Sequence, residues 1–132
     1  MARISLFPKA VKEPTAFPEP PADWMGSRPE WAIFWALLRL GYKDRFTYQS
    51  AKMGGRLARG GAVIDFEIPE LNLGINVQSI YYHYRTTALK VAGELQRAQL
   101  ESQGTRLIFI SEENALRDPI YYTKEALSFR EH

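Results

Sequence analysis

Apolar residues between Ser27 and Gly41 occupy nearly every side of a helical period, and this pattern predicts a buried helix. Glu30 follows Ser27 by three residues, which is the spacing of a capping box, and Pro29 is tolerated in a first helical turn. Gly41 predicts the end of the helix, because glycine readily adopts the left-handed conformation found there. We assign the aromatic residues of this helix to the core: Trp31, Phe34 and Trp35.

Three short runs with the character of strands follow, and we expect strands over 45–50, 62–68 and 73–79. The stretch "PELN" between the second and third runs predicts a tight hairpin turn. The basic, glycine-rich stretch "AKMGGRLARGG" links the first strand to the second.

A second helix is expected from Thr86 or Thr87 to just before Gly104, followed by a fourth strand over 105–110. Ser111 then caps a short helical turn, and a last helix is expected over about 118–128. The element order is therefore α-β-β-β-α-β-α. Because the second helix connects strands three and four as a crossover, these two strands should be parallel. We expect an α/β fold with a mixed sheet flanked by helices.

The first 26 residues differ from the rest of the chain. Six of the eight prolines fall within the first 29 residues, so an extended arm, partly polyproline II, is expected over 1–26 and one folded domain over 27–132. The arm is either a floppy leader or a segment that packs along its own domain or along a partner, since Leu6, Phe7, Phe17 and Trp24 are costly to leave in water.

Composition narrows the function only a little. A net charge of +2 over 132 residues permits nucleic-acid binding without demanding it. The absence of cysteine excludes disulfides and thiolate metal sites. No apolar run approaches the roughly 18 residues of a membrane span, and the first residues lack the apolar core of a signal peptide. We therefore expect no membrane association and a cytoplasmic location.

Polar residues alternate with apolar ones on the two central strands. Ile64, Phe66 and Ile68 should share one face of strand two, and Ile75 and Val77 one face of strand three. The opposite faces would together carry a polar patch made of Asp65, Glu67, Asn76 and Gln78, with Glu30 packed near it and His83 just beyond strand three. Carboxylate and amide oxygens suit Mg²⁺, and a histidine could activate water. The alternative is an ordinary solvated sheet face.

The element order, "VIDF" on strand two and "GINVQSIYYHY" on strand three together resemble the PD-(D/E)XK nuclease superfamily. Within it, the chain is most similar to the very-short-patch-repair endonuclease branch and to related homing endonucleases. The resemblance covers about residues 27–128. It implies the α-β-β-β-α-β core of that superfamily and an origin in a phage or mobile element.

The resemblance also implies roles for individual residues. Asp65 would bind Mg²⁺, or Mn²⁺ in its place, and the Val77 carbonyl would be a second ligand. His83 would be the general base, and Glu30 would assist the metal or orient the histidine. Gln78 would contact a metal-bound water or a phosphate; otherwise it only pairs the strands.

The sequence departs from the family pattern at several positions. Asn76 and Gln78 stand where the superfamily carries an acid and a lysine, although the repair branch does not use that pair. The aspartate that orients the histidine in the repair branch falls near Gly93, with Glu94 beside it as a substitute. The zinc-binding residues of the mismatch-repair enzyme are missing.

These features lead to two functional hypotheses. The first is a metal-dependent DNA endonuclease or nicking enzyme in the host cytoplasm, whose phosphate contacts come from Lys52, Arg56, Arg59 and Arg85; for the glycine-rich loop the alternative is a solvated, mobile hairpin. The second is a catalytically inactive nuclease fold that binds DNA or has a structural role in a phage assembly or virion. In either case the arm could join the chain into a homodimer or a larger assembly.

Overall fold

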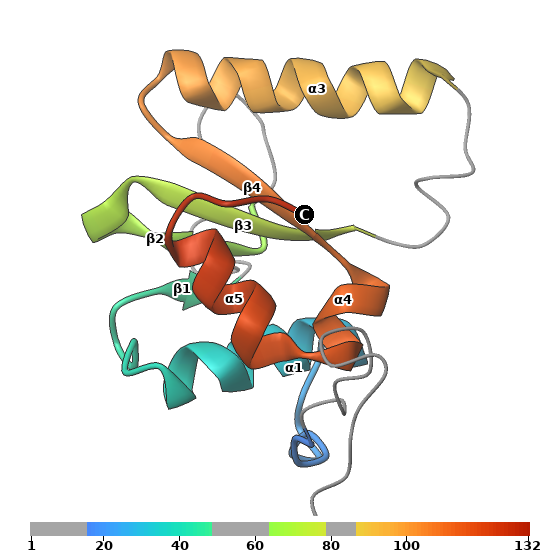
Figure 1. Ribbon diagram of the computed structural model, residues 1–132, viewed down its shortest axis with the longest axis vertical. Helices are drawn as coiled ribbons and strands as arrows, with labels where there is room; N and C mark the ends of the chain where they lie inside the picture. Colours follow the sequence, from blue (N-terminus) through green and yellow to red (C-terminus); the bar gives the residue numbers. More distant parts are fainter. Residues whose placement is uncertain (1–15, 49–63, 79–86) are drawn as a thin grey trace, which may run out of the picture.

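The computed structural model describes residues 16–48, 64–78 and 87–132. These residues form an α/β domain with a four-stranded mixed sheet (Figure 1). The α-helices are α1 (Arg28–Arg39), α3 (Thr87–Ser102), α4 (Glu112–Arg117) and α5 (Pro119–Leu127). The strands are β1 (Thr47–Tyr48), β2 (Phe66–Ile68), β3 (Leu73–Gln78) and β4 (Arg106–Ser111). The order of elements agrees with the order predicted from the sequence.

The strands lie in the order β1-β2-β3-β4. β1 and β3 are both antiparallel to β2, whereas β3 and β4 are parallel. The crossover through α3 explains the parallel pair, because the chain must return to the same end of the sheet before β4 can begin. The predicted mixed sheet flanked by helices is thus confirmed.

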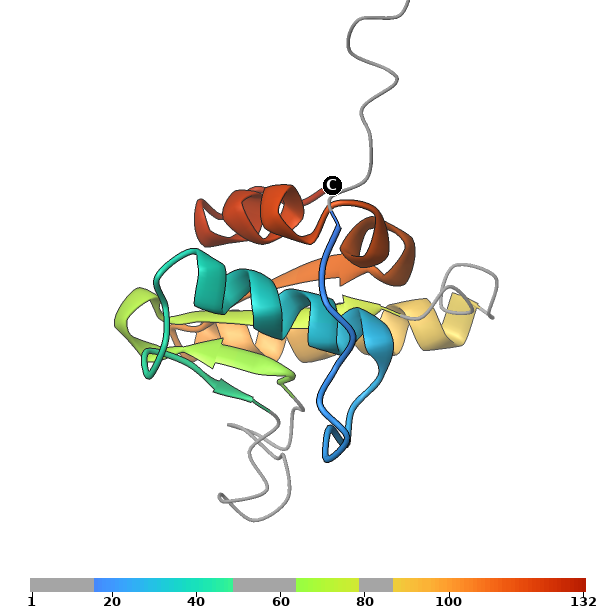
Figure 2. The ribbon, with the colours of Figure 1, turned by 90° about the horizontal axis from the view of Figure 1, so that it is seen from below.

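The helices cover the two faces of the sheet unequally (Figures 1 and 2). On one face, α1, α4 and α5 enclose a buried cluster made of Ile33, Leu37, Phe66, Ile68, Leu73, Ile75, Ile108, Ile110, Ala115 and Ala126. On the other face lies α3, and the buried cluster beneath it contains Ile64, Leu100, Leu107 and Phe109. Among the described residues, the layer under α3 therefore buries much less apolar surface, which is the main source of stability for a packed helix.

The helix signals in the sequence act as predicted. The Ser27 hydroxyl accepts from the Glu30 N–H, and the Glu30 carboxylate accepts from the Ser27 N–H, which completes the capping box. Gly41 and Gly104 follow the ends of α1 and α3 with φ of 90° and 89°. A residue with a side chain would be strained in this left-handed region, so glycine is the residue that ends both helices readily.

The second predicted strand is shorter than expected within the described residues. β2 spans Phe66–Ile68, and Asp65 forms a bend in front of it. Because the alternation of side chains is interrupted at this bend, Ile64 belongs to the cluster under α3, whereas Phe66 faces α1. The prediction that Ile64 and Phe66 share one face was therefore wrong. The hairpin is closed by "PELN" as predicted: Ile68 pairs with Leu73, and between them a 3-10 turn over Pro69–Leu71 precedes Asn72 in the left-handed conformation.

The last part of the predicted arm packs against α1, where Figure 2 shows it lying across the helix. The Trp31 indole N–H donates to the Pro18 carbonyl at 2.7 Å, and Arg28 pairs with Glu19 at 2.7 Å. The Trp24 ring stacks on Tyr48 with 4.9 Å between centroids. Residues 16–26 are thus an integral part of the domain surface, while residues 1–15 lie outside the described residues.

Across the described ranges, no helix is both long enough and apolar enough to cross a membrane.

Candidate functional site at one end of the sheet

Several predicted site residues gather at one end of the sheet. β1 ends at Tyr48, which is paired with Phe66 at the beginning of β2. Phe66 is paired in turn with Ile75, two residues before Val77 near the end of β3. Because neighbouring antiparallel strands run in opposite directions, the end of β1, the start of β2 and the end of β3 lie together.

Asp65 makes two hydrogen bonds to β3 at this end, one to Asn76 and one to Val77. The Asp65 N–H donates to the Asn76 side-chain Oδ1 at 2.7 Å. The Asp65 carboxylate Oδ2 accepts from the Val77 N–H at 2.9 Å. Side chains thus take over the pairing of β2 and β3 where the backbone ladder of β2 has stopped, and they hold the Asp65 carboxylate in one position against β3.

The Val77 carbonyl is directed to the same side as this carboxylate. In an extended strand, the N–H and the C=O of one residue point toward the same neighbouring strand. The Val77 N–H points toward β2, where it meets Asp65 Oδ2, so the Val77 carbonyl points there as well. The two groups predicted as metal ligands therefore lie on the same side of β3, next to the start of β2. A carboxylate and a backbone carbonyl are both ligands that Mg²⁺ accepts.

Glu30 approaches the same end from α1. Its Oε1 accepts from the Ser27 N–H at 2.9 Å and from the Tyr48 hydroxyl at 3.0 Å. Tyr48 packs against the cluster on the α1 face, so the Glu30 carboxylate lies on this face, above the end of β1. Tyr48 was not among the predicted site residues, because nothing in the sequence indicates that its hydroxyl meets a helix 18 residues away.

The predicted polar patch is divided between two places. Glu67 is paired with Gly74, which is paired in turn with Leu107, and Asn76 is paired with Phe109. Because Leu107 and Phe109 belong to the cluster under α3, the side chains of Glu67 and Asn76 are on the α3 side of the sheet. Gln78, the last residue of β3, is on that side as well. Asp65 instead reaches along the plane of the sheet to the backbone of β3, because its bend interrupts the alternation. The prediction that Asp65 shares a face with Glu67 was therefore wrong.

Other predicted site residues lie outside the described residues. These are His83, Lys52, Arg56, Arg59 and Arg85. The described ranges end at Tyr48, begin again at Ile64 and end again at Gln78, and these three residues lie at the end of the sheet where Asp65 lies. Glu94, the proposed partner of the histidine, lies on α3 and pairs with Arg97 at 3.7 Å.

Gly26 is required by the close approach of Tyr48 and Glu30. A Cβ at this position would overlap the Tyr48 hydroxyl and lie 2.8 Å from Glu30 Oε1. We expect Gly26→Ala to lower the free energy of unfolding by about 1–3 kcal/mol, because it forces these two side chains apart. Urea denaturation followed by tryptophan fluorescence measures this loss.

A double-mutant cycle with Tyr48→Phe tests the cause of that loss. Removing the hydroxyl removes the overlapping atom, so Gly26→Ala should cost less in the Tyr48→Phe background. Equal costs in both backgrounds would show that the hydroxyl is not what excludes a side chain at Gly26.

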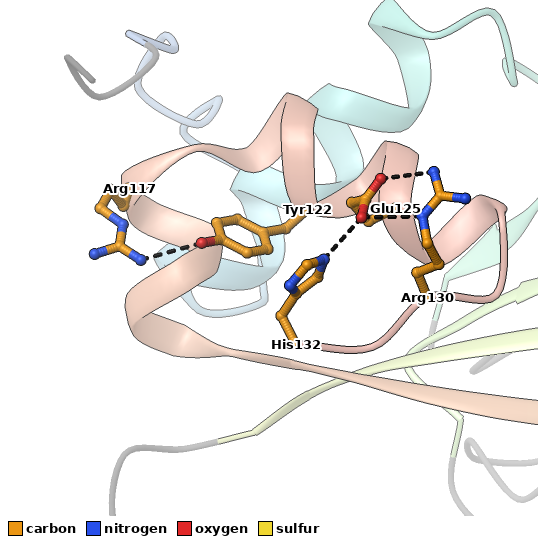
Figure 3. Close-up of polar contacts among 5 residues, drawn as sticks. All are labelled: Arg117, Tyr122, Glu125, Arg130 and His132. Carbon is orange, nitrogen blue, oxygen red and sulfur yellow. Dashed lines mark hydrogen bonds and ion pairs between the residues drawn. The ribbon is translucent and has the colours of Figure 1, made fainter. Parts of the chain in front are cut away.

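A second polar cluster, which the sequence did not reveal, joins the last turn of α5 to the residues that follow it (Figure 3). The Glu125 carboxylate accepts two hydrogen bonds from Arg130, at 3.0 and 2.7 Å, and contacts the His132 ring at 2.8 Å. Arg130 and His132 lower the pKa of Glu125 to about 2. The stabilisation is fully present above the ordinary pKa of a glutamate and is lost progressively as the pH falls from that value through about 2. No motif marks this cluster, because its members are brought together by the turn that ends α5.

Within the three described ranges, no group of three or more histidine, cysteine, aspartate or glutamate side chains is arranged to hold a metal ion. A metal at the end of the sheet would therefore depend on Asp65 and the Val77 carbonyl, and on water or substrate oxygens for its remaining ligands. Comparison of the chain with protein-family models, with curated proteins and with solved structures found no match.

Proposed function

We propose that the protein is a metal-dependent DNA endonuclease or nicking enzyme of PD-(D/E)XK type. The observation that carries this proposal is the position of Asp65. Its carboxylate is fixed 2.9 Å from the Val77 N–H, and the Val77 carbonyl is directed to the same side. These two residues are the ones that the resemblance to very-short-patch-repair endonucleases assigns to the metal.

The geometry is consistent with a divalent cation at this point. Mg²⁺ is usually bound in proteins through one or two carboxylates, with water and substrate phosphates as the other ligands. When bound, such a cation lowers the pKa of a water molecule and stabilises charge on a phosphoryl oxygen. Asp65 would anchor it, and the Val77 carbonyl would complete the protein's share of the ligands.

The other residues have complementary roles in this proposal. His83 removes a proton from the attacking water as a general base. Glu30, which the Tyr48 hydroxyl holds at 3.0 Å, assists from the α1 face. Gln78 contacts a bound water or a phosphate oxygen. The basic residues Lys52, Arg56, Arg59 and Arg85 neutralise DNA phosphates.

A second candidate is a nuclease fold that has lost its chemistry and serves as a DNA-binding or structural protein of a phage assembly. The hydrogen bonds that Glu30 and Asp65 make within the fold favour this second candidate. Glu30 completes a capping box and holds Tyr48, and Asp65 continues the pairing of β2 with β3. Each acid thus contributes to the fold in a way that requires no catalysis.

Cleavage assays distinguish the two candidates. Supercoiled plasmid, branched DNA and single-stranded DNA would be incubated with the protein in Mg²⁺, in Mn²⁺ and in a chelator. We expect cutting with either metal and none with the chelator. We also expect His83→Ala to slow the reaction about 100-fold or more, which is the usual contribution of a general base.

DNA binding measured by fluorescence anisotropy serves as the control for these assays. His83→Ala should bind DNA as the unaltered protein does, since a general base contributes to the reaction and not to the affinity. A folded protein that binds DNA but cuts none of the substrates with either metal would contradict the enzyme and support the second candidate.

A further inference from the structure

The segment after α5 forms a short strap, Phe129–His132, that returns along β4 (Figure 1). Phe129 has a φ of 62°, and this left-handed residue reverses the chain at the end of α5. Alternate residues of the strap then bind different elements. Arg130 and His132 contact Glu125 of α5, as Figure 3 shows, whereas Glu131 reaches the opposite way.

Glu131 connects the strap to both β4 and α3. Its Oε2 accepts from the Phe109 backbone N–H at 2.7 Å, and its Oε1 accepts from the Arg97 guanidinium at 3.0 Å. Arg97 also lies over the Phe109 ring, 4.3 Å from its centroid. The Arg97 side chain is only 19% exposed and that of Glu131 32%, so this contact is partly shielded from water.

Glu131 accepts a hydrogen bond from the Phe109 N–H. A further strand added beside β4 would accept from this same N–H through one of its backbone carbonyls. β4 is an edge strand among the four that the structure describes. The Arg106 N–H points inward, to the Asn72 carbonyl on the β3 side. Because the direction of the N–H groups alternates along a strand, those of Leu107 and Phe109 both point outward, away from β3. An edge strand with such outward groups pairs readily with another chain unless it is covered.

We propose that the strap is an edge guard that keeps β4 from pairing with a second copy of this chain, and that Glu131 is the latch that holds it. The Glu131 carboxylate takes the place of a peptide carbonyl from an added strand. The ion pair of Glu131 with Arg97 and that of Arg130 with Glu125 hold the strap in this position beside β4. The proposal does not depend on the proposed nuclease activity.

A second copy is the partner that β4 fits best. Residues 107–110 of β4 are all apolar, and the only charge on the strand is Arg106, at its beginning. Two β4 strands placed antiparallel, with Phe109 opposite Phe109, would set Leu107 opposite Ser111. This arrangement has a two-fold axis and brings no like charges face to face, which are the requirements of a self-complementary interface.

The variant Glu131→Ala tests the latch. NMR hydrogen exchange would follow the Phe109 amide, and light scattering would give the molar mass over a range of concentrations. We expect exchange of this amide to be about tenfold faster or more, because its acceptor is removed. We also expect a dimer to form with rising concentration in the variant but not in the unaltered protein at the same concentrations.

Two further variants make the result specific. Glu131→Gln keeps an acceptor oxygen but loses the charge, so its exchange rate should lie between those of the unaltered protein and Glu131→Ala. Glu101→Gln, which changes an exposed acid on α3, should alter neither measurement. Circular dichroism would establish that each variant is folded.

Two outcomes would overturn the proposal. If the Phe109 amide stays as protected in Glu131→Ala as in the unaltered chain, Glu131 is not the latch. If the amide opens while the folded variant remains a monomer at all concentrations, the strap does not guard the edge against a second copy.

Discussion

Asp65→Asn is expected to reduce metal-dependent DNA cleavage about 100-fold or more, while the protein remains folded. The substitution removes the negative charge that would hold the metal, and a bound metal supplies several kcal/mol of transition-state stabilisation. Asparagine keeps an oxygen that can accept from the Val77 N–H, as Asp65 Oδ2 does at 2.9 Å. We therefore expect the free energy of unfolding to fall by only about 1 kcal/mol. Plasmid cleavage rates and urea denaturation measure the two effects.

The control for this prediction is Asp23→Asn, which makes the same chemical change at an exposed position outside the sheet. It should leave both cleavage and stability unchanged. Raising the Mg²⁺ concentration should restore part of the activity of Asp65→Asn if weaker metal binding is the cause. Full activity of Asp65→Asn would remove Asp65 from the proposed mechanism.

Phe66→Ala is expected to lower the free energy of unfolding by about 3–5 kcal/mol, which is the usual range for removing a buried phenylalanine. Phe66 is fully buried and lies between two neighbouring strands, opposite Tyr48 on β1 and Ile75 on β3. Its ring is 5.0 Å from that of Tyr48 and 6.1 Å from that of Phe46. A domain of ordinary stability, about 5–15 kcal/mol, would lose a large part of it.

Two comparisons show whether burial is the cause. Phe66→Leu keeps most of the side-chain volume and should cost about 1.5 kcal/mol or less. Phe17→Ala removes a half-buried ring that contacts Trp35 from the arm, and it should cost less than Phe66→Ala. Urea denaturation followed by tryptophan fluorescence measures all three. A larger loss for Phe17→Ala would mean that the arm, and not the sheet, holds the main core.

Much of the fold could be predicted because its signals are local. Ser27 and Glu30 form a capping box within four residues, and Asp118 accepts from the Tyr121 N–H as the N-cap of α5. The parallel pairing of β3 with β4 follows from the length of the connection between them. Each of these features depends on neighbours in the sequence or on a general rule of chain connection.

The candidate site was predicted less completely. Asp65, Val77 and Glu30 do meet the same end of the sheet, as their places on the strands and on α1 suggested. The division of the polar patch was missed, because a strict alternation was assumed through Asp65. The bend at Asp65 interrupts this alternation, so Ile64 lies on the face opposite to the expected one.

The sequence by itself determined the order and type of the elements, the capped beginnings of α1, α4 and α5, and the glycines that follow the ends of α1 and α3. These depend on short-range hydrogen bonds and on backbone preferences that each residue brings with it. Only the tertiary structure decided which side chains meet across long separations. Three hydrogen bonds are of this kind: from the Asp65 N–H to the Asn76 side chain, from the Tyr48 hydroxyl to Glu30, and from the Phe109 N–H to Glu131. Each joins groups between 11 and 22 residues apart, and their geometry exists only once the sheet and its helices have packed.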